Sequence, residues 1–250
     1  MNLEEVRGFA WAQAEVYTNP NSRAYFSDLA FKHMAEMKLL LAGGRLNKND
    51  KWENVYRHCL VQIAVMDITC DLLGIEGDDK DTLLTVAAVH DWKKRIDITH
   101  ADPNTEPEWM QKILKYYNAI SPDISLMSAT GPNFIEVGLN GQSTKLQEVA
   151  FYVDDIVNED MVVPVLDRLY LNKLKKGVKA LDADHALTSR LGGLKYSDAE
   201  IKLATSIEQK FAAIIAKRSG LKLGNGESLP TLILEEMNKR INSFGKLSSK

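Results

Sequence analysis

The sequence has little cysteine, no long apolar run and almost no net charge, and each shortage excludes a class of protein. Its 250 residues contain two cysteines, Cys59 and Cys70, which are too few and too badly spaced for a zinc ribbon, so we expect reduced thiols in the core. The longest apolar runs, such as the one around residues 61–66, are far too short to span a bilayer. The net charge of -3 gives no strong signal for nucleic-acid binding.

The N-terminal segment, residues 1–17, also lacks the basic and then apolar pattern of a secretory signal. We therefore expect a cytoplasmic protein that does not engage a membrane. The length corresponds to one large domain or two small ones, and a hydrophobic fraction of 45% is enough for a proper core. We predict a single helical domain over residues 1–250.

Alternating strand patterns are scarce, and helix signals dominate the chain. Apolar spacing and capping signals predict helices at 22–41, 53–73, 82–96, 109–119, 144–157 and 197–215, and a last one that begins at Pro230. Residues 120–141 are expected to be irregular, with a short β segment at 133–139. The pattern predicts an all-α fold with a core at about 22–180 and a C-terminal helical extension at about 195–245.

Three of these helices carry histidine or aspartate. His58 lies early in the helix at 53–73, and His90 and Asp91 end a nearly all-apolar helix. A short segment joins these two helices, so they should be antiparallel neighbours that bring His58 beside His90 and Asp91. Asp154 ends an apolar stretch in which a carboxylate needs a partner. Imidazole nitrogen and carboxylate oxygen are ligands for divalent metals, and the four residues therefore predict a metal site.

The same residues resemble the H…HD…D pattern of the HD-domain metal-dependent phosphohydrolases. Residues 86–94, VAAVHDWKK, are similar to the family's AALLHDIGK helix end, and residues 146–154, LQEVAFYVD, are similar to its EKIVYYAD segment. The resemblance covers residues 53–160 and implies an HD-domain-like helical bundle.

The resemblance also implies a hydrolase that cleaves a phosphomonoester or nucleotide with a metal-activated water. Its substrate would be a small phosphorylated molecule. One divalent ion (Mn, Mg, Fe, Co, Ni or Zn) would be held by His58, His90, Asp91 and Asp154. Asp91 would also contact the reacting water. Lys94 would stabilise negative charge on the substrate phosphate, and Arg57 is a further candidate for that contact.

Two departures from the family pattern narrow this prediction. Members with two metals usually carry more histidines between the HD dipeptide and the last Asp, whereas here His100 is the only one, so we expect a single ion. Members that cleave guanosine polyphosphates carry acids soon after the HD dipeptide. This chain has Lys93, Lys94 and Arg95 there, which argues against that substrate.

Other interpretations stay open at this point. The quartet could belong to a catalytically inactive HD-like module that binds a nucleotide or partner protein, or it could be accidental in a purely structural helical protein. Asp67, Asp71 and Asp155 are expected to face solvent, although Asp154 and Asp155 could exchange their roles. Arg168 is expected to belong to a solvated helix end, residues 168–179, with a phosphate-facing patch as the alternative. The segment Asp182–His185 is expected to be a polar loop or helix start, and the oligomeric state is open.

Overall fold

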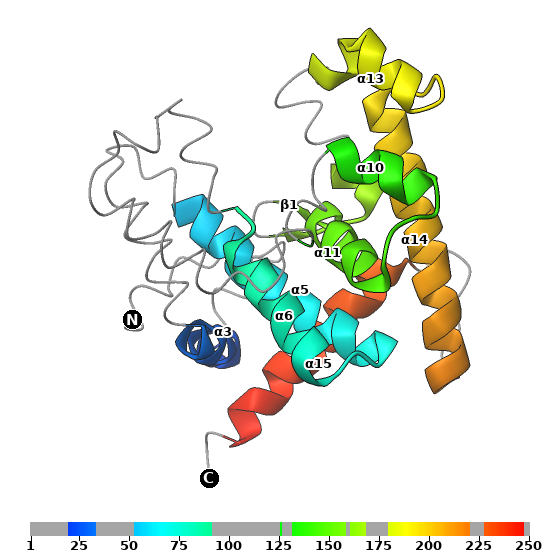
Figure 1. Ribbon diagram of the computed structural model, residues 1–250. Helices are drawn as coiled ribbons and strands as arrows, with labels where there is room; N and C mark the ends of the chain where they lie inside the picture. The colour runs from blue at the N-terminus through cyan, green and yellow to red at the C-terminus, as the bar shows by residue number, and fades with distance from the viewer. Residues whose placement is uncertain are drawn as a thin grey trace.

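The computed structural model of this chain describes residues 20–33, 53–91, 126, 132–158, 161–168, 180–220 and 228–247. These residues form an all-α fold, as predicted (Figure 1). The helices are α3 (Pro20–Lys32), α5 (Glu53–Leu73), α6 (Gly77–Val89), α10 (Pro132–Leu139), α11 (Lys145–Asp155), η2 (Ala180–Ala183), α13 (His185–Arg190), α14 (Tyr196–Ser219) and α15 (Leu229–Leu247). A small antiparallel ribbon consists of β1 (Val157–Asn158) and β2 (Met161–Val162). Among the described helices, none has the length and apolar character needed to cross a membrane.

Helix α5 is the centre of the bundle. Every residue from His58 to Met66 is buried, whichever face of the helix it occupies. A helix that is apolar all round must be covered on every side, and α5 contacts α3, α6, α11, α14 and α15 (Figure 1). Its end at Leu73 agrees with the prediction, because Gly74 follows it with a positive φ of 65° that suits a helix terminus.

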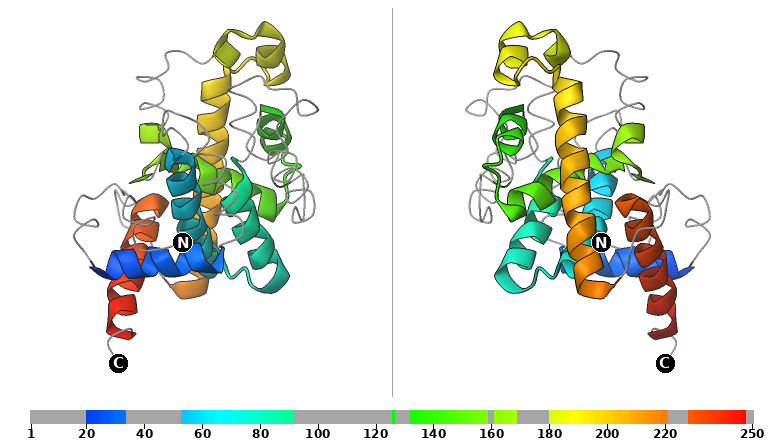
Figure 2. Two further views of the ribbon diagram at one scale, coloured as in Figure 1. Left: turned by 90° about the vertical axis from the view of Figure 1, so that its left-hand side faces the viewer. Right: turned by 90° about the vertical axis from the view of Figure 1, so that its right-hand side faces the viewer.

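The other helices form two groups around α5. Helix α15 packs against α3 and α5, and Figure 2 shows α3 lying across α15. The long helix α14 packs against α5, α10 and α11 and runs along one side of the molecule. Both C-terminal helices therefore cover the same central helix. The proposed division into a core and a C-terminal extension stays a prediction.

The start of α11 agrees with the sequence. The Gln147 backbone N–H donates to Thr144 Oγ1 at 3.2 Å, and the Thr144 N–H donates to Gln147 Oε1 at 2.9 Å. This reciprocal capping box is the one that the sequence predicts. The helix ends at Asp155 rather than at residue 157, because Val157 already pairs with Val162 in the ribbon.

The expectation of an irregular segment with a short β strand at 133–139 is wrong. These residues form α10, which begins at Pro132 and packs on α14. Gly138 is compatible with this helix because it makes room for Leu203: a Cβ at Gly138 would lie 2.7 Å from a Leu203 methyl group. Tertiary packing therefore overrides a glycine's low helix propensity.

Two predicted helix starts are also wrong. Helix α6 begins at Gly77, several residues before the expected cap at Asp81, and Asp78 and Asp79 lie in its first turn, where negative charge favours the helix dipole. Helix α14 has no Ser197–Glu200 capping box. The Ser197 N–H instead donates to the Asp182 carboxylate of η2 at 2.7 Å. The first helix is also shorter than the predicted 22–41, since α3 ends at Lys32. The predicted helix at 109–119 lies outside the described residues.

Asp67 and Asp71 do not simply face solvent, as expected from the sequence. Arg240 of α15 donates to both carboxylates at 2.7 Å, and Lys80 of α6 approaches both at 2.6 Å. Partial burial alone would raise the pKa of Asp71, but hydrogen bonds from Lys80 and Arg240 bring it below its ordinary value of 3.8. This ion network ties α5 to α6 and α15.

Replacing Arg240 with methionine should lower the free energy of unfolding by about 1–2 kcal/mol, because both of its charged hydrogen bonds are lost. The folded-state pKa of Asp71 is depressed, so this stabilisation should be complete above about pH 4 and should fade as the pH drops through that pKa. Denaturant unfolding at several pH values measures both effects. The control is Lys239→Met, since Lys239 makes only an exposed pair with Glu236. Equal losses in the two variants would contradict the prediction.

Candidate metal centre

Three helices bring the predicted ligands together. His58 lies in the first part of α5, His90 is the C-terminal cap of α6 with Asp91 next to it, and Asp154 lies in the last turn of α11. The antiparallel pairing of α5 and α6 that the sequence predicted is what places the start of one helix beside the end of the other. Helix α11 contacts both and supplies the fourth residue.

The donor atoms of these residues, hereafter the His–Asp cluster, face one another. His58 Nε2 lies 3.6 Å from Asp91 Oδ2 and 3.6 Å from Asp154 Oδ1. His90 Nε2 lies 3.5 Å from Asp91 Oδ1 and 3.6 Å from the same Asp154 oxygen. Possible ligand atoms of His58, His90 and Asp154 all lie within 4.8 Å of one another, whereas Asp91 turns one oxygen to each histidine.

A hydrogen bond to the backbone orients the imidazole of His90. Its Nδ1 lies 3.1 Å from the backbone oxygen of Ala87, and a carbonyl can only accept, so Nδ1 is the donor. In the neutral ring the lone pair is then on Nε2, which faces Asp91 and Asp154. Ligating histidines are commonly oriented by such a bond from the other ring nitrogen.

The cluster fits a divalent cation in both size and charge. Donor atoms about 2.1 Å from an ion lie roughly 3.0–3.4 Å from their neighbours, so spacings of 3.5–3.6 Å require shifts of only a few tenths of an ångström. Both Asp91 and Asp154 are largely buried, with side chains 12% and 19% exposed. Buried carboxylates need compensating positive charge, which a bound ion would supply.

Arg168 also belongs to the site, although it was expected elsewhere from the sequence. It was expected on a solvated helix end, but its side chain is only 17% exposed. Its guanidinium donates to Asp155 Oδ1 at 2.9 Å and to the backbone oxygen of Asp154. The sequence signal was a lone arginine at the edge of a lysine-rich stretch, which does not by itself indicate burial.

The expected surface position of Asp155 is also wrong. It was expected to be a surface acid, yet it is 5% exposed and its described partner is Arg168. Asp154 faces the His–Asp cluster, whereas Asp155, one residue later on the helix, is turned toward the arginine. The two adjacent carboxylates therefore have different partners, one among the histidines and one with a guanidinium.

The electrostatics keep Asp154 ionised. Burial alone would raise its pKa, but the positive charge of Arg168, the largest lowering influence, brings the pKa well below its usual range. Burial would also lower the pKa of Arg168, and the carboxylates of Asp154 and Asp155 keep it above its ordinary value. Asp154 thus offers a charged oxygen to the cluster.

Gln62 also contacts the cluster, although Gln62 was not predicted as a site residue. It follows His58 by four residues on α5, so the two side chains share a helix face. Its Nε2 lies 3.1 Å from His58 Nε2 and donates to Asp154 Oδ1 at 2.7 Å. A buried polar residue in an otherwise apolar run, one turn from a predicted ligand, was the signal that could have revealed it.

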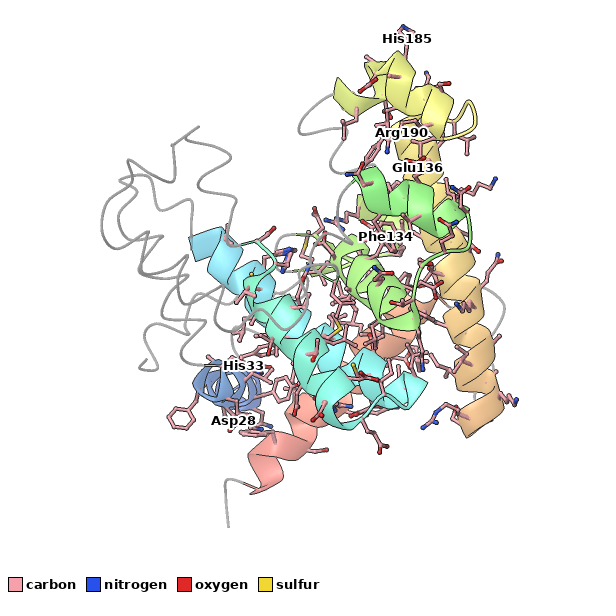
Figure 3. The ribbon with its side chains drawn as sticks, in the orientation of Figure 1. Asp28, His33, Phe134, Glu136, His185 and Arg190 are labelled. Atoms are coloured by element: carbon pink, nitrogen blue, oxygen red, sulfur yellow. The ribbon has the colours of Figure 1, made fainter. Side chains whose placement is uncertain are left out.

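Less can be said of where the remaining predicted site residues lie. Arg57 belongs to α5 directly before His58, and Lys94 and His100 lie outside the described residues. The segment at Asp182–His185 is a helix start, as expected: Asp184 caps α13 by accepting from the Leu187 N–H. His185 is exposed and lies at the outer end of the molecule (Figure 3).

Replacing Arg168 with methionine should destabilise the protein by about 3 kcal/mol, because it leaves the buried carboxylate of Asp155 without its ion-pair partner. Denaturant unfolding measures the loss. The matched control is Arg190→Met: Arg190 binds Glu136 on the surface between α13 and α10, with its side chain 51% exposed (Figure 3). That change should cost less than about 1 kcal/mol. A loss at Arg168 no larger than at Arg190 would contradict the interpretation of Asp155 as a buried charge.

Comparison of the chain with protein-family models, with curated proteins and with solved structures finds no match. The resemblance of residues 53–160 to the HD-domain phosphohydrolases stays a prediction from the sequence motifs.

Proposed function

We propose that this chain is a metal-dependent phosphohydrolase that cleaves a phosphomonoester or nucleotide. The observation that carries the proposal is the convergence of two imidazole nitrogens and two carboxylates from α5, α6 and α11, with neighbouring donor atoms 3.5–3.6 Å apart. This donor set suits divalent metal ions, and Mn, Mg, Fe, Co, Ni and Zn all remain candidates.

Different residues of the chain would bind the metal, orient the water and bind the phosphate. His58, His90 and Asp154 would hold the ion, which supplies a water of lowered pKa and neutralises phosphoryl charge. Asp91 has one oxygen near each histidine, so one oxygen would bind the ion while the other orients the attacking water. Arg57 and Lys94 would bind the substrate phosphate, since Arg57 directly precedes His58 and Lys94 follows Asp91 by three residues.

Metal content is the first test of this proposal. Purified protein reconstituted with Mn²⁺, Zn²⁺ or Co²⁺ should retain close to one ion per chain, and His90→Ala and Asp154→Asn should retain almost none. Binding at a free-ion concentration 100 times the dissociation constant should stabilise the wild type by about 2.7 kcal/mol. The control is His185→Ala, because His185 is exposed and distant from the cluster. Wild-type protein that binds no ion would contradict the proposal.

Turnover is the second test. The loaded wild type should release phosphate from a generic aryl phosphate or from a nucleotide in a panel. His90→Ala should lose at least about 100-fold of that rate, because losing a direct ligand should cost more than losing an outer-shell contact. Stoichiometric metal without turnover on any phosphoester would favour the alternative, an inactive module that binds a nucleotide or partner protein.

A further inference from the structure

Gln62 occupies an unusual position for a neutral side chain. It is 2% exposed on the central helix and contacts two of the proposed ligands at once. His58 Nε2 and Asp154 Oδ1 are 3.6 Å apart, and the amide nitrogen lies 3.1 Å from the first and 2.7 Å from the second. The carboxamide thus bridges the same two atoms that a metal ion would bridge.

The chemistry of the amide fixes the direction of both bonds. An amide nitrogen has two hydrogens and no lone pair to offer, so Gln62 donates to both partners. The opposite orientation would place Oε1 against the Asp154 carboxylate, which is repulsive. His58 Nε2 must therefore be the acceptor, with its lone pair directed at Gln62.

A neutral imidazole nitrogen has one lone pair in the ring plane. That lone pair of His58 can accept from Gln62 or bind an ion, but it cannot do both. The two amide hydrogens therefore occupy the lone pair of His58 and the oxygen of Asp154, and they supply partial positive charge to both.

We propose that Gln62 is a placeholder for the metal: its amide stabilises the metal-free protein by bridging His58 and Asp154, and an ion must displace it. The inference rests on the proposed metal site. Hydrogen bonds that exist only in the metal-free state oppose binding by their own free energy, because they are broken when the ion enters. Gln62 therefore weakens metal affinity and at the same time stabilises the protein without metal.

The test is to replace Gln62 with leucine and, separately, with methionine, which matches its length. Both variants lose the amide hydrogens. Zinc affinity is measured by competition with a chromophoric chelator, and the stability of metal-free and zinc-loaded protein by denaturant unfolding. Zinc should bind about tenfold more tightly to both variants, a gain of about 1.4 kcal/mol. The metal-free variants should be less stable than the wild type, and the zinc-loaded forms should be similar.

Gln142→Leu is the matched control, since Gln142 is exposed and outside the cluster, and its affinity for zinc should be that of the wild type. Unchanged affinity in the Gln62 variants would reduce Gln62 to a packing residue and overturn the inference. Weaker affinity would also overturn it, because Gln62 would then be assisting the ligands rather than competing with the ion. A wild type that binds neither zinc nor any of the other candidate ions would defeat the proposed function itself, a result distinct from either.

Discussion

The burial of helix α5 on every side is the constraint on which the rest of the structure depends. Because residues 58–66 are all buried, five other helices must pack around them, and the ends of α6 and α11 are brought to the first part of α5. The same burial places His58 and Gln62 in a setting with little water. Polar groups there must satisfy one another, which makes the His–Asp cluster a connected set rather than a scatter of surface charges.

Charge compensation is the second organising feature. Asp154 and Asp155 are adjacent and both shielded from solvent, and Arg168 interacts with both. This arrangement holds Asp154 ionised toward the histidines while Asp155 holds the arginine in place. At the opposite end of α5, Asp67 and Asp71 are compensated by Lys80 and Arg240. Acids near both ends of the central helix, two from α11 and two from α5 itself, are thus matched by cations.

Local sequence signals predicted the elements that depend on local interactions. The Thr144–Gln147 capping box, the end of the central helix at Gly74 and the helix that begins around Pro230 all involve residues within a few positions of one another. The predictions that were wrong depend on distant partners. Helix α10 is stabilised by packing on α14, and the first turn of α14 is capped by Asp182 of another element.

The sequence by itself determined the helical class and the candidacy of His58, His90, Asp91 and Asp154, because apolar periodicity and the identity of donor atoms are properties of the chain. Only the tertiary structure decided which neighbours complete the cluster. Asp155 and Arg168 carry no local signature, and Gln62 shows only as a polar residue in an apolar run. Their roles arise from contacts across as many as 92 residues of sequence. A buried charge needs a compensating partner, and the tertiary structure determines which residue that partner is.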